Sequence, residues 1–131
     1  MTNLELPFPK LTPHLARTFD PLCKALPPEQ AIAQAEAVTT HLIRIQATLQ
    51  TNEFLDVRLA EAIARALLAL LADYATFLPK QQALIIGAAR YFVKDDDVEP
   101  DSVSILGFDD DARVLNYVLD VIDRPELKVK A

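Results

Sequence analysis

The chain has few of the glycines that form phosphate-binding loops and few of the cysteines that form disulfides. Its 131 residues include two glycines and one cysteine. Gly87 and Gly107 alone cannot form a glycine-rich phosphate-binding loop. The single cysteine, Cys23, excludes an intramolecular disulfide and is typical of proteins from a reducing compartment. We therefore expect a cytoplasmic protein in which Cys23 is a small, half-buried apolar residue.

Residues that commonly carry catalysis or bind zinc are also scarce. His14 and His41 are the two histidines, and neither has a Cys or a second His at ligand spacing, which argues against a zinc site. We expect His41 to be a half-exposed structural residue. No Ser/His/Asp or Cys/His set is suggested by proximity in the sequence, so a non-enzymatic protein is the default expectation.

The chain lacks a long uninterrupted apolar run. The most apolar stretch, 59–72, contains Glu61 and Arg65, whereas a membrane-spanning helix needs about 20 consecutive apolar residues. Residues 1–9 lack the basic start and apolar run of a signal peptide. We therefore expect no membrane span. The net charge of −6 argues against nucleic acid and anionic membrane surfaces as partners.

Apolar residues, in contrast, are abundant and recur with the period of a helix. They make up 51% of the chain, which is enough for the core of one domain covering residues 1–131. The pattern predicts an all-α, single-domain helical bundle with about four main helices and short N-terminal helical pieces. The expected main helices are 28–50, 53–78, 80–93 and 113–122, and residues 123–131 are expected to be a charged, frayed tail.

The proline-rich N-terminal arm, residues 1–27, permits only short regular structure. Residues 1–28 hold six of the nine prolines. Thr12-Pro13 and Asp20-Pro21 each have the pattern of a helix cap followed by proline at the first helical position. We expect two short helical pieces here.

Two of the main helices have informative faces. The first, 28–50, has an apolar stripe at spacings of three and four residues that includes Ile32, Val38 and Ile45. The second, 53–78, is apolar nearly all round and is expected to be the central helix. Arg58, Glu61 and Arg65 form its narrow polar stripe, which is expected to be a salt-bridge surface or, alternatively, an anion site.

The negative charge of the protein comes from one segment. Residues 95–111 contain eight of the 19 acidic residues and no Lys or Arg, while the remainder has 13 basic and 11 acidic residues. Pro100 prevents a helix from running through the segment. Gly107 permits a positive φ, and Asp109 or Asp110 is expected to cap the last helix. The segment is therefore expected to be an ordered loop.

The region 80–122 carries a motif with specific spacing. Its residues are Tyr91, Asp97, Pro100, Asp101, Gly107, Phe108, Asp110 and Asp111. The order and spacing of these residues resemble the motif of the YkvA-like bacterial domain of unknown function, with Lys94-Asp95 where that family has Ser-Pro. The resemblance covers about a third of the chain. Relatives often carry apolar membrane segments, so the resemblance implies a soluble version of the family, but it implies no activity.

Two explanations of the acidic residues stay open. In the first they are structural: Asp101 binds loop amides, and Arg90, Lys94 and Arg113 neutralise nearby carboxylates. In the second, Asp97 or Asp101 converges with Asp110 or Asp111 on a divalent cation, Mg²⁺, Mn²⁺ or Ca²⁺. An EF-hand is excluded, because Ser102 and Phe108 occupy the positions of its glycine and glutamate.

The favoured function is an interaction or structural module that binds a protein partner or a second copy of itself and needs no cofactor. The alternative is a divalent-metal-binding protein or metal-dependent enzyme centred on the acidic loop, 95–111.

Overall fold

The structure is a computed structural model that describes the backbone of residues 11–48, 54–94 and 105–129. This part contains helices and no strand, which confirms the all-α class. The elements, in chain order, are α1 (Pro13–Phe19), η2 (Asp20–Leu22), α2 (Pro28–Thr48), α3 (Phe54–Ala72), η3 (Tyr74–Thr76), α4 (Pro79–Lys94), α5 (Ile105–Val121) and η6 (Pro125–Leu127).

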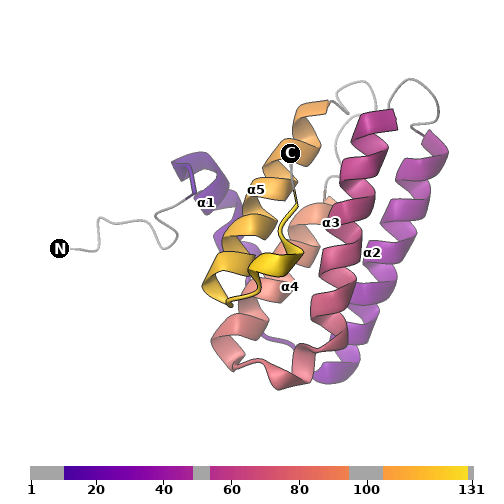
Figure 1. The fold of residues 1–131 in the computed structure, drawn as a ribbon. Helices are drawn as coiled ribbons and strands as arrows, with labels where there is room; N and C mark the ends of the chain where they lie inside the picture. The colour runs from indigo at the N-terminus through magenta and orange to yellow at the C-terminus, as the bar shows by residue number, and fades with distance from the viewer. Residues whose placement is uncertain (1–10, 49–53, 95–104, 130–131) are drawn as a thin grey trace.

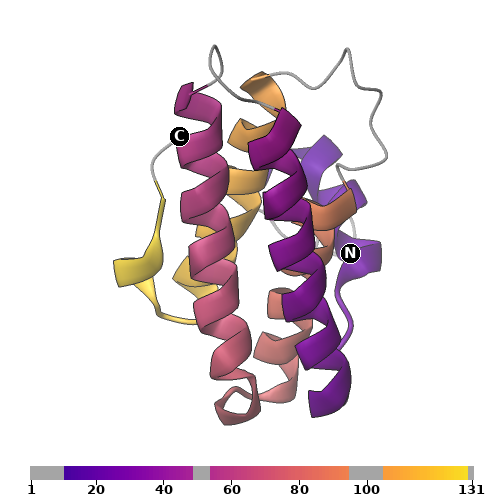
Figure 2. The ribbon, with the colours of Figure 1, turned by 90° about the vertical axis from the view of Figure 1, so that its right-hand side faces the viewer.

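Four long helices form the bundle, and consecutive helices run in opposite directions (Figure 1). Helices α2 and α5 each pack against both α3 and α4. The short helix α1 and the turn η2 cover the side of the bundle formed by α4 and α5 (Figure 2). Within the described ranges, no helix has the length and hydropathy that a crossing of the membrane requires.

Helix α4, rather than α3, is the most enclosed element. Five consecutive residues of α4, 85–89, are buried, and the helix contacts α1, η2, α2, α3, η3 and α5. Helix α3 keeps an outer stripe that includes Arg58 and Arg65 exposed to solvent. Our expectation that α3 is the central helix was therefore wrong, because α4 is covered on one side by the N-terminal segment, which α3 is not.

Helix α2 buries most of the apolar stripe that its sequence indicated, together with His41. Val38, His41 and Ile45 face the core, with exposures of 0%, 5% and 8%, and they follow the i, i+3, i+7 spacing of one helical face. Ile32 was expected in the buried stripe, but it is 63% exposed. His41 was expected to be half-exposed, but it is buried. Its ring packs at right angles to the ring of Phe92, with 4.9 Å between the two ring centroids.

Helix α3 ends at Ala72, earlier than the predicted 78, because Tyr74 begins a 3₁₀ turn that is tied to the N-terminal segment. The Tyr74 hydroxyl donates to the carbonyl oxygen of Leu26 at 2.6 Å and accepts from its amide at 2.7 Å. The Gln82 side chain on α4 donates to the Tyr74 carbonyl at 3.0 Å. A buried tyrosine ring, 3% exposed, thus joins the start of α2 to the α3–α4 connection.

The two predicted N-terminal helical pieces are present. The Thr12 hydroxyl caps α1 by accepting from the Leu15 amide at 3.3 Å, and Pro13 occupies the first turn. The second piece is the single 3₁₀ turn η2, in which Asp20 closes α1 instead of capping a new helix. The turn does not continue as a helix because Cys23 has an extended backbone, with φ of −79° and ψ of 113°.

Helix α5 begins at Ile105, eight residues before the predicted Arg113. Gly107 is helical, so no positive φ is needed there, and Asp109 to Asp111 lie inside the helix instead of at its cap. In the sequence, Ile105, Phe108, Ala112 and Leu115 continue one helical stripe through the acidic residues. That continuous stripe outweighs the cost of about 1 kcal/mol for a helical glycine.

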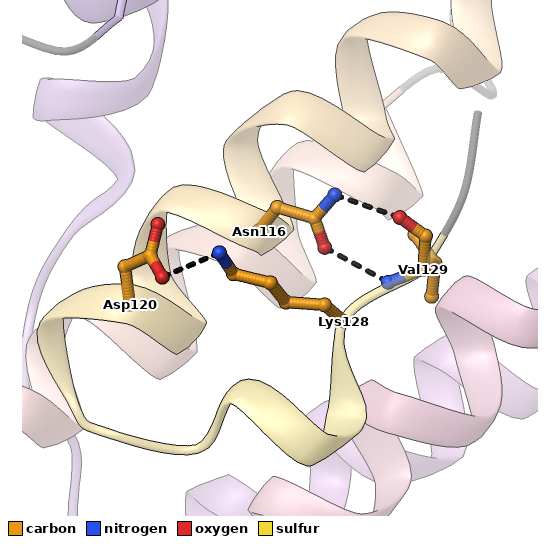
Figure 3. A network of polar contacts seen from close by, with 4 residues as sticks. All are labelled: Asn116, Asp120, Lys128 and Val129. Carbon is orange, nitrogen blue, oxygen red and sulfur yellow. Dashed lines mark hydrogen bonds and ion pairs between the residues drawn. The ribbon is translucent and has the colours of Figure 1, made fainter.

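The chain after α5 returns along that helix, contrary to our expectation of a frayed tail. Asp123, with φ of 64°, ends α5, and the Arg124 amide donates to the Leu119 carbonyl at 2.8 Å in a Schellman motif. The Asn116 side chain then binds the backbone of Val129 through both amide atoms, at 2.8 and 2.9 Å (Figure 3). Lys128 pairs with Asp120 beside it.

Candidate functional site

The sequence-predicted site residues divide into those that the structure describes and those that it does not. Asp97, Pro100 and Asp101 lie outside the described residues. Gly107 and Phe108 lie in α5, with only their backbone described. Tyr91 and Asp111 are buried, with 8% and 3% exposure, and Asp110 is half-buried.

The buried polar side chains lie toward one end of the bundle, where α2 and α4 end and α5 begins. His41 and Asp111 are the buried polar residues of the described chain. His41 lies about two-thirds of the way along α2 and contacts Phe92 in the last turn of α4. Asp111 lies on the second turn of α5. A buried ionisable side chain is costly unless it has polar partners, so this end of the bundle is a polar part of an otherwise apolar core.

In the part of the chain that the structure describes, no three His, Cys, Asp or Glu side chains are grouped so that they could hold a metal ion. Asp110 and Asp111 are the members of the predicted carboxylate set that are described. The site formed with Asp97 or Asp101 therefore stays a prediction.

Arg90 makes a contact that the sequence did not indicate. Its guanidinium Nη1 donates to the Leu22 carbonyl oxygen at 3.4 Å, and its expected pairing with the acidic segment stays a prediction. The contact holds η2 against α4. On α3, Glu61 is similarly used between helices, because its Oε2 accepts from Gln46 Nε2 of α2 at 3.0 Å.

The N-terminal segment meets α4 at Cys23. The thiol is half-buried and donates to the Phe19 carbonyl oxygen at 3.5 Å. Burial, and then the nearby Asp20 carboxylate, raise the pKa of Cys23 to about 12. Burial and the neighbouring Cys23 raise the pKa of Tyr117 on α5. A thiol that stays protonated at neutral pH is a poor nucleophile, which fits the structural role predicted for Cys23.

A groove of about 330 Å³ lies between α1 and α5. It is lined by Leu11, Thr12, Leu15, Arg113, Asn116, Tyr117 and Asp120. Two of its polar side chains, Asn116 and Asp120, bind the C-terminal segment. The groove therefore lies where residues 11–15 and the segment after α5 meet α5, and three of its polar side chains, Thr12, Asn116 and Asp120, already serve the fold.

The outward face of α2 is the most unusual surface of the described chain. Ile32 and Ile43 on this face are 63% and 59% exposed. They are separated by eleven residues, which is about three helical turns, so their side chains differ by only about 20° in direction. Sequence reasoning missed this face because it assigned Ile32 to the core, although the eleven-residue spacing of the two isoleucines is visible in the sequence.

Few charges accompany the two isoleucines. Thr39, Thr40 and Ala47 are exposed beside them. In the whole of α2, from 28 to 48, the Asp, Glu, Lys and Arg residues are Glu29, Glu36 and Arg44. Glu36 lies between the two isoleucines, and Glu29 and Arg44 lie on one flank of them. The surface is therefore a ridge of apolar and hydroxyl side chains with three charges, and it runs along the longest helix of the bundle. We call Ile32, Glu36, Thr39, Thr40 and Ile43 the α2 ridge.

Comparison with protein-family models, with curated proteins and with solved structures finds no match to this chain. The resemblance to the YkvA-like domain accordingly stays a prediction that rests on the motif residues.

Proposed function

We propose that this chain is a helical interaction module that binds another protein through the α2 ridge. The observation that supports the proposal is the exposure of Ile32 and Ile43, 63% and 59%, on one line of the same helix. Isolated exposed apolar residues are ordinary, but aligned ones on a surface with few charges are typical of the centre of a protein interface. We propose the cytoplasm as its compartment, because a single cysteine is typical of reducing conditions.

The size of the ridge indicates a weak or transient contact. Full burial of an exposed isoleucine contributes about 1.5–3 kcal/mol. Ile32 and Ile43 are 63% and 59% exposed, so burial of the part that remains exposed contributes about 2–4 kcal/mol for the two together. Association costs at least about 4 kcal/mol in lost translational and rotational freedom. The surrounding contacts of Thr39 and Thr40 must therefore supply the remainder.

Photo-cross-linking inside cells tests the proposal. A photoreactive amino acid replaces Ile43 in one variant and Leu78, which is 66% exposed between α3 and α4, in a matched control. We expect a discrete protein adduct from position 43 and none from position 78. Adducts of equal yield from both positions, or none from position 43, would contradict the proposal.

The burial of Asp111, at 3% exposure next to Asp110 on α5, favours one second candidate, a divalent-cation site that also uses Asp97 or Asp101. A cation that binds only the folded state stabilises it by about 2.7 kcal/mol at one hundred times its dissociation constant. This candidate therefore predicts that Mg²⁺, Mn²⁺ or Ca²⁺ raises the melting temperature, and that Asp101→Ala removes the increase. A melting temperature unchanged by all three cations would exclude it.

A further inference from the structure

The α2 ridge is complementary to itself when it is turned end over end. Ile32 and Ile43 lie about 16 Å apart along the helix, at 1.5 Å per residue. A two-fold axis perpendicular to α2, placed midway between the two isoleucines, would bring Ile32 of one copy opposite Ile43 of the other. A pair of identical surfaces related in this way forms a closed dimer.

Building on the proposed function, we propose that the partner is a second copy of this chain, with the two α2 helices packed antiparallel through the α2 ridge. In this register, opposed residue numbers add up to 75. Ile32 of each copy therefore packs against Ile43 of the other, and Glu36 lies opposite Thr39. The two apolar contacts of the dimer thus bury the four isoleucines that two separate copies expose, Ile32 and Ile43 of each.

The charges of α2 select the antiparallel direction. Glu29 and Arg44 lie on the same flank of the ridge, about 60° and 120° around the helix from Ile32. The two-fold axis places the same flank of both helices on one side of the dimer. Arg44 of one copy and Glu29 of the other then differ by only about 3 Å in height along the helix axis. Two ion pairs therefore form, each between Arg44 of one copy and Glu29 of the other. In a parallel pair, Glu29 and Arg44 of the two copies would lie fifteen residues, about 22 Å, apart along the helix, so neither ion pair would form.

Glu36 limits the strength of the dimer. Glu36 of one copy and Glu36 of the other differ by only about 4.5 Å in height along the helix axis, because both residues are close to the two-fold axis. The two carboxylates repel each other. The hydroxyl groups of Thr39 and Thr40 from the opposite copy are placed to donate to them, which offsets part of the repulsion. A single helix pair also buries less than the roughly 1,200 Å² of a standard interface, so the dimer is weak and reversible.

Sedimentation equilibrium of the full chain, from about 1 µM to about 1 mM, covers the range in which such a dimer dissociates. We expect wild type to form dimers reversibly. Ile43→Lys should weaken association at least about tenfold, whereas Leu78→Lys, which makes the same change outside the ridge, should not. Circular dichroism and thermal melting confirm that both variants are folded. Monomeric wild type throughout the range, or equal weakening by the two variants, would overturn the proposal.

A charge exchange tests the direction of the helices. Arg44→Glu should weaken the dimer, and the double variant Glu29→Arg/Arg44→Glu should restore it, because the two positions meet only between copies. Glu29 and Arg44 are fifteen residues apart in one helix and cannot pair within it. Glu36→Gln should strengthen the dimer. Failure of the double variant to restore association would reject the antiparallel register.

Cysteine cross-linking tests the register itself in a Cys23→Ala background. Chains with Ile32→Cys should form disulfides with chains carrying Ile43→Cys faster than either chain does with itself, since the bond needs close Cα atoms. The photo-adduct at position 43 separates this inference from the proposed function. A mass of twice the 14.5 kDa chain supports both. An adduct of any other mass keeps the interaction module and rejects the dimer, and no adduct rejects both.

Discussion

Replacement of Gly87 by alanine sets two physical effects against each other. Gly87 lies inside α4, where alanine is favoured over glycine by about 1 kcal/mol. Helix propensity alone therefore predicts stabilisation. The added Cβ, however, would lie 2.5 Å from Cys23 Sγ, 2.8 Å from Phe19 Cε1 and 3.2 Å from Cys23 Cα. Favourable carbon contacts are about 3.5–4.0 Å, so all three distances are too short.

The neighbours of Gly87 cannot move easily. Phe19 is completely buried, and the Cys23 thiol donates a hydrogen bond to the Phe19 carbonyl oxygen. One of the short contacts is to a backbone atom, Cys23 Cα. Overpacking of a core costs about 1–3 kcal/mol, and these contacts belong in the upper half of that range. After the gain of about 1 kcal/mol from propensity, we expect Gly87→Ala to lower the free energy of unfolding by about 1–2 kcal/mol.

Urea denaturation of four proteins measures the effect as a double-mutant cycle: wild type, Gly87→Ala, Cys23→Ala and the double variant. Cys23→Ala removes the shortest contact, so Gly87→Ala should cost at least about 0.5 kcal/mol less in that background. Ala83→Gly, one turn earlier in α4, calibrates the propensity effect. A gain of about 1 kcal/mol for Gly87→Ala, with no coupling to Cys23, would refute the close packing of the N-terminal segment on α4.

Three further predictions follow from single contacts. Tyr74→Phe removes the hydroxyl that donates to and accepts from the Leu26 backbone, and should lower the free energy of unfolding by about 1–3 kcal/mol in urea denaturation; a loss below about 0.5 kcal/mol would mean that water replaces the hydroxyl. Asp123→Gly should raise the melting temperature and Asp123→Ala should lower it, because residue 123 has a φ of 64° that glycine adopts without strain; the reverse order would contradict the Schellman assignment. The Cys23 pKa is raised from 9.0 to about 12, so its contribution to stability is complete below about pH 9 and is lost as the pH rises towards 12. The unfolding free energy of wild type relative to Cys23→Ala should therefore fall between pH 8 and about pH 10.5, and an unchanged difference would count against the burial of the thiol.

The helical class and most of the helix starts were determined by local chemistry. Thr12-Pro13, Pro28 and Pro79 mark the starts of α1, α2 and α4, because proline fits the first turn, where its missing amide proton has no partner to lose. The 3.6-residue recurrence of apolar residues was sufficient to predict an all-α bundle, since only helices bury such a pattern on one side. These properties involve neighbours in the sequence, so they can be read from it.

The ends of helices that depend on distant partners could not be read in this way. Helix α3 stops at Ala72 because Tyr74 binds Leu26, 48 residues earlier. The segment after α5 is held because Asn116 binds Val129, and the polarity of residues 123–131 gave no sign of this. The early start of α5 was available from the stripe 105–108–112–115, but the dense acidic residues and Gly107 outweighed it in the prediction.

Only the tertiary structure decided which side of each helix is covered. In α2, Val38 and Ile45 are buried together with His41, while Ile32 is exposed, because the packing of α3 and α4 sets the rotation of the helix and apolar content does not. The same packing makes α4 the enclosed helix and leaves the α2 ridge uncovered by the described elements. An apolar side chain favours burial wherever it lies, so the sequence alone cannot tell an isoleucine of the core from one that is available to a second molecule.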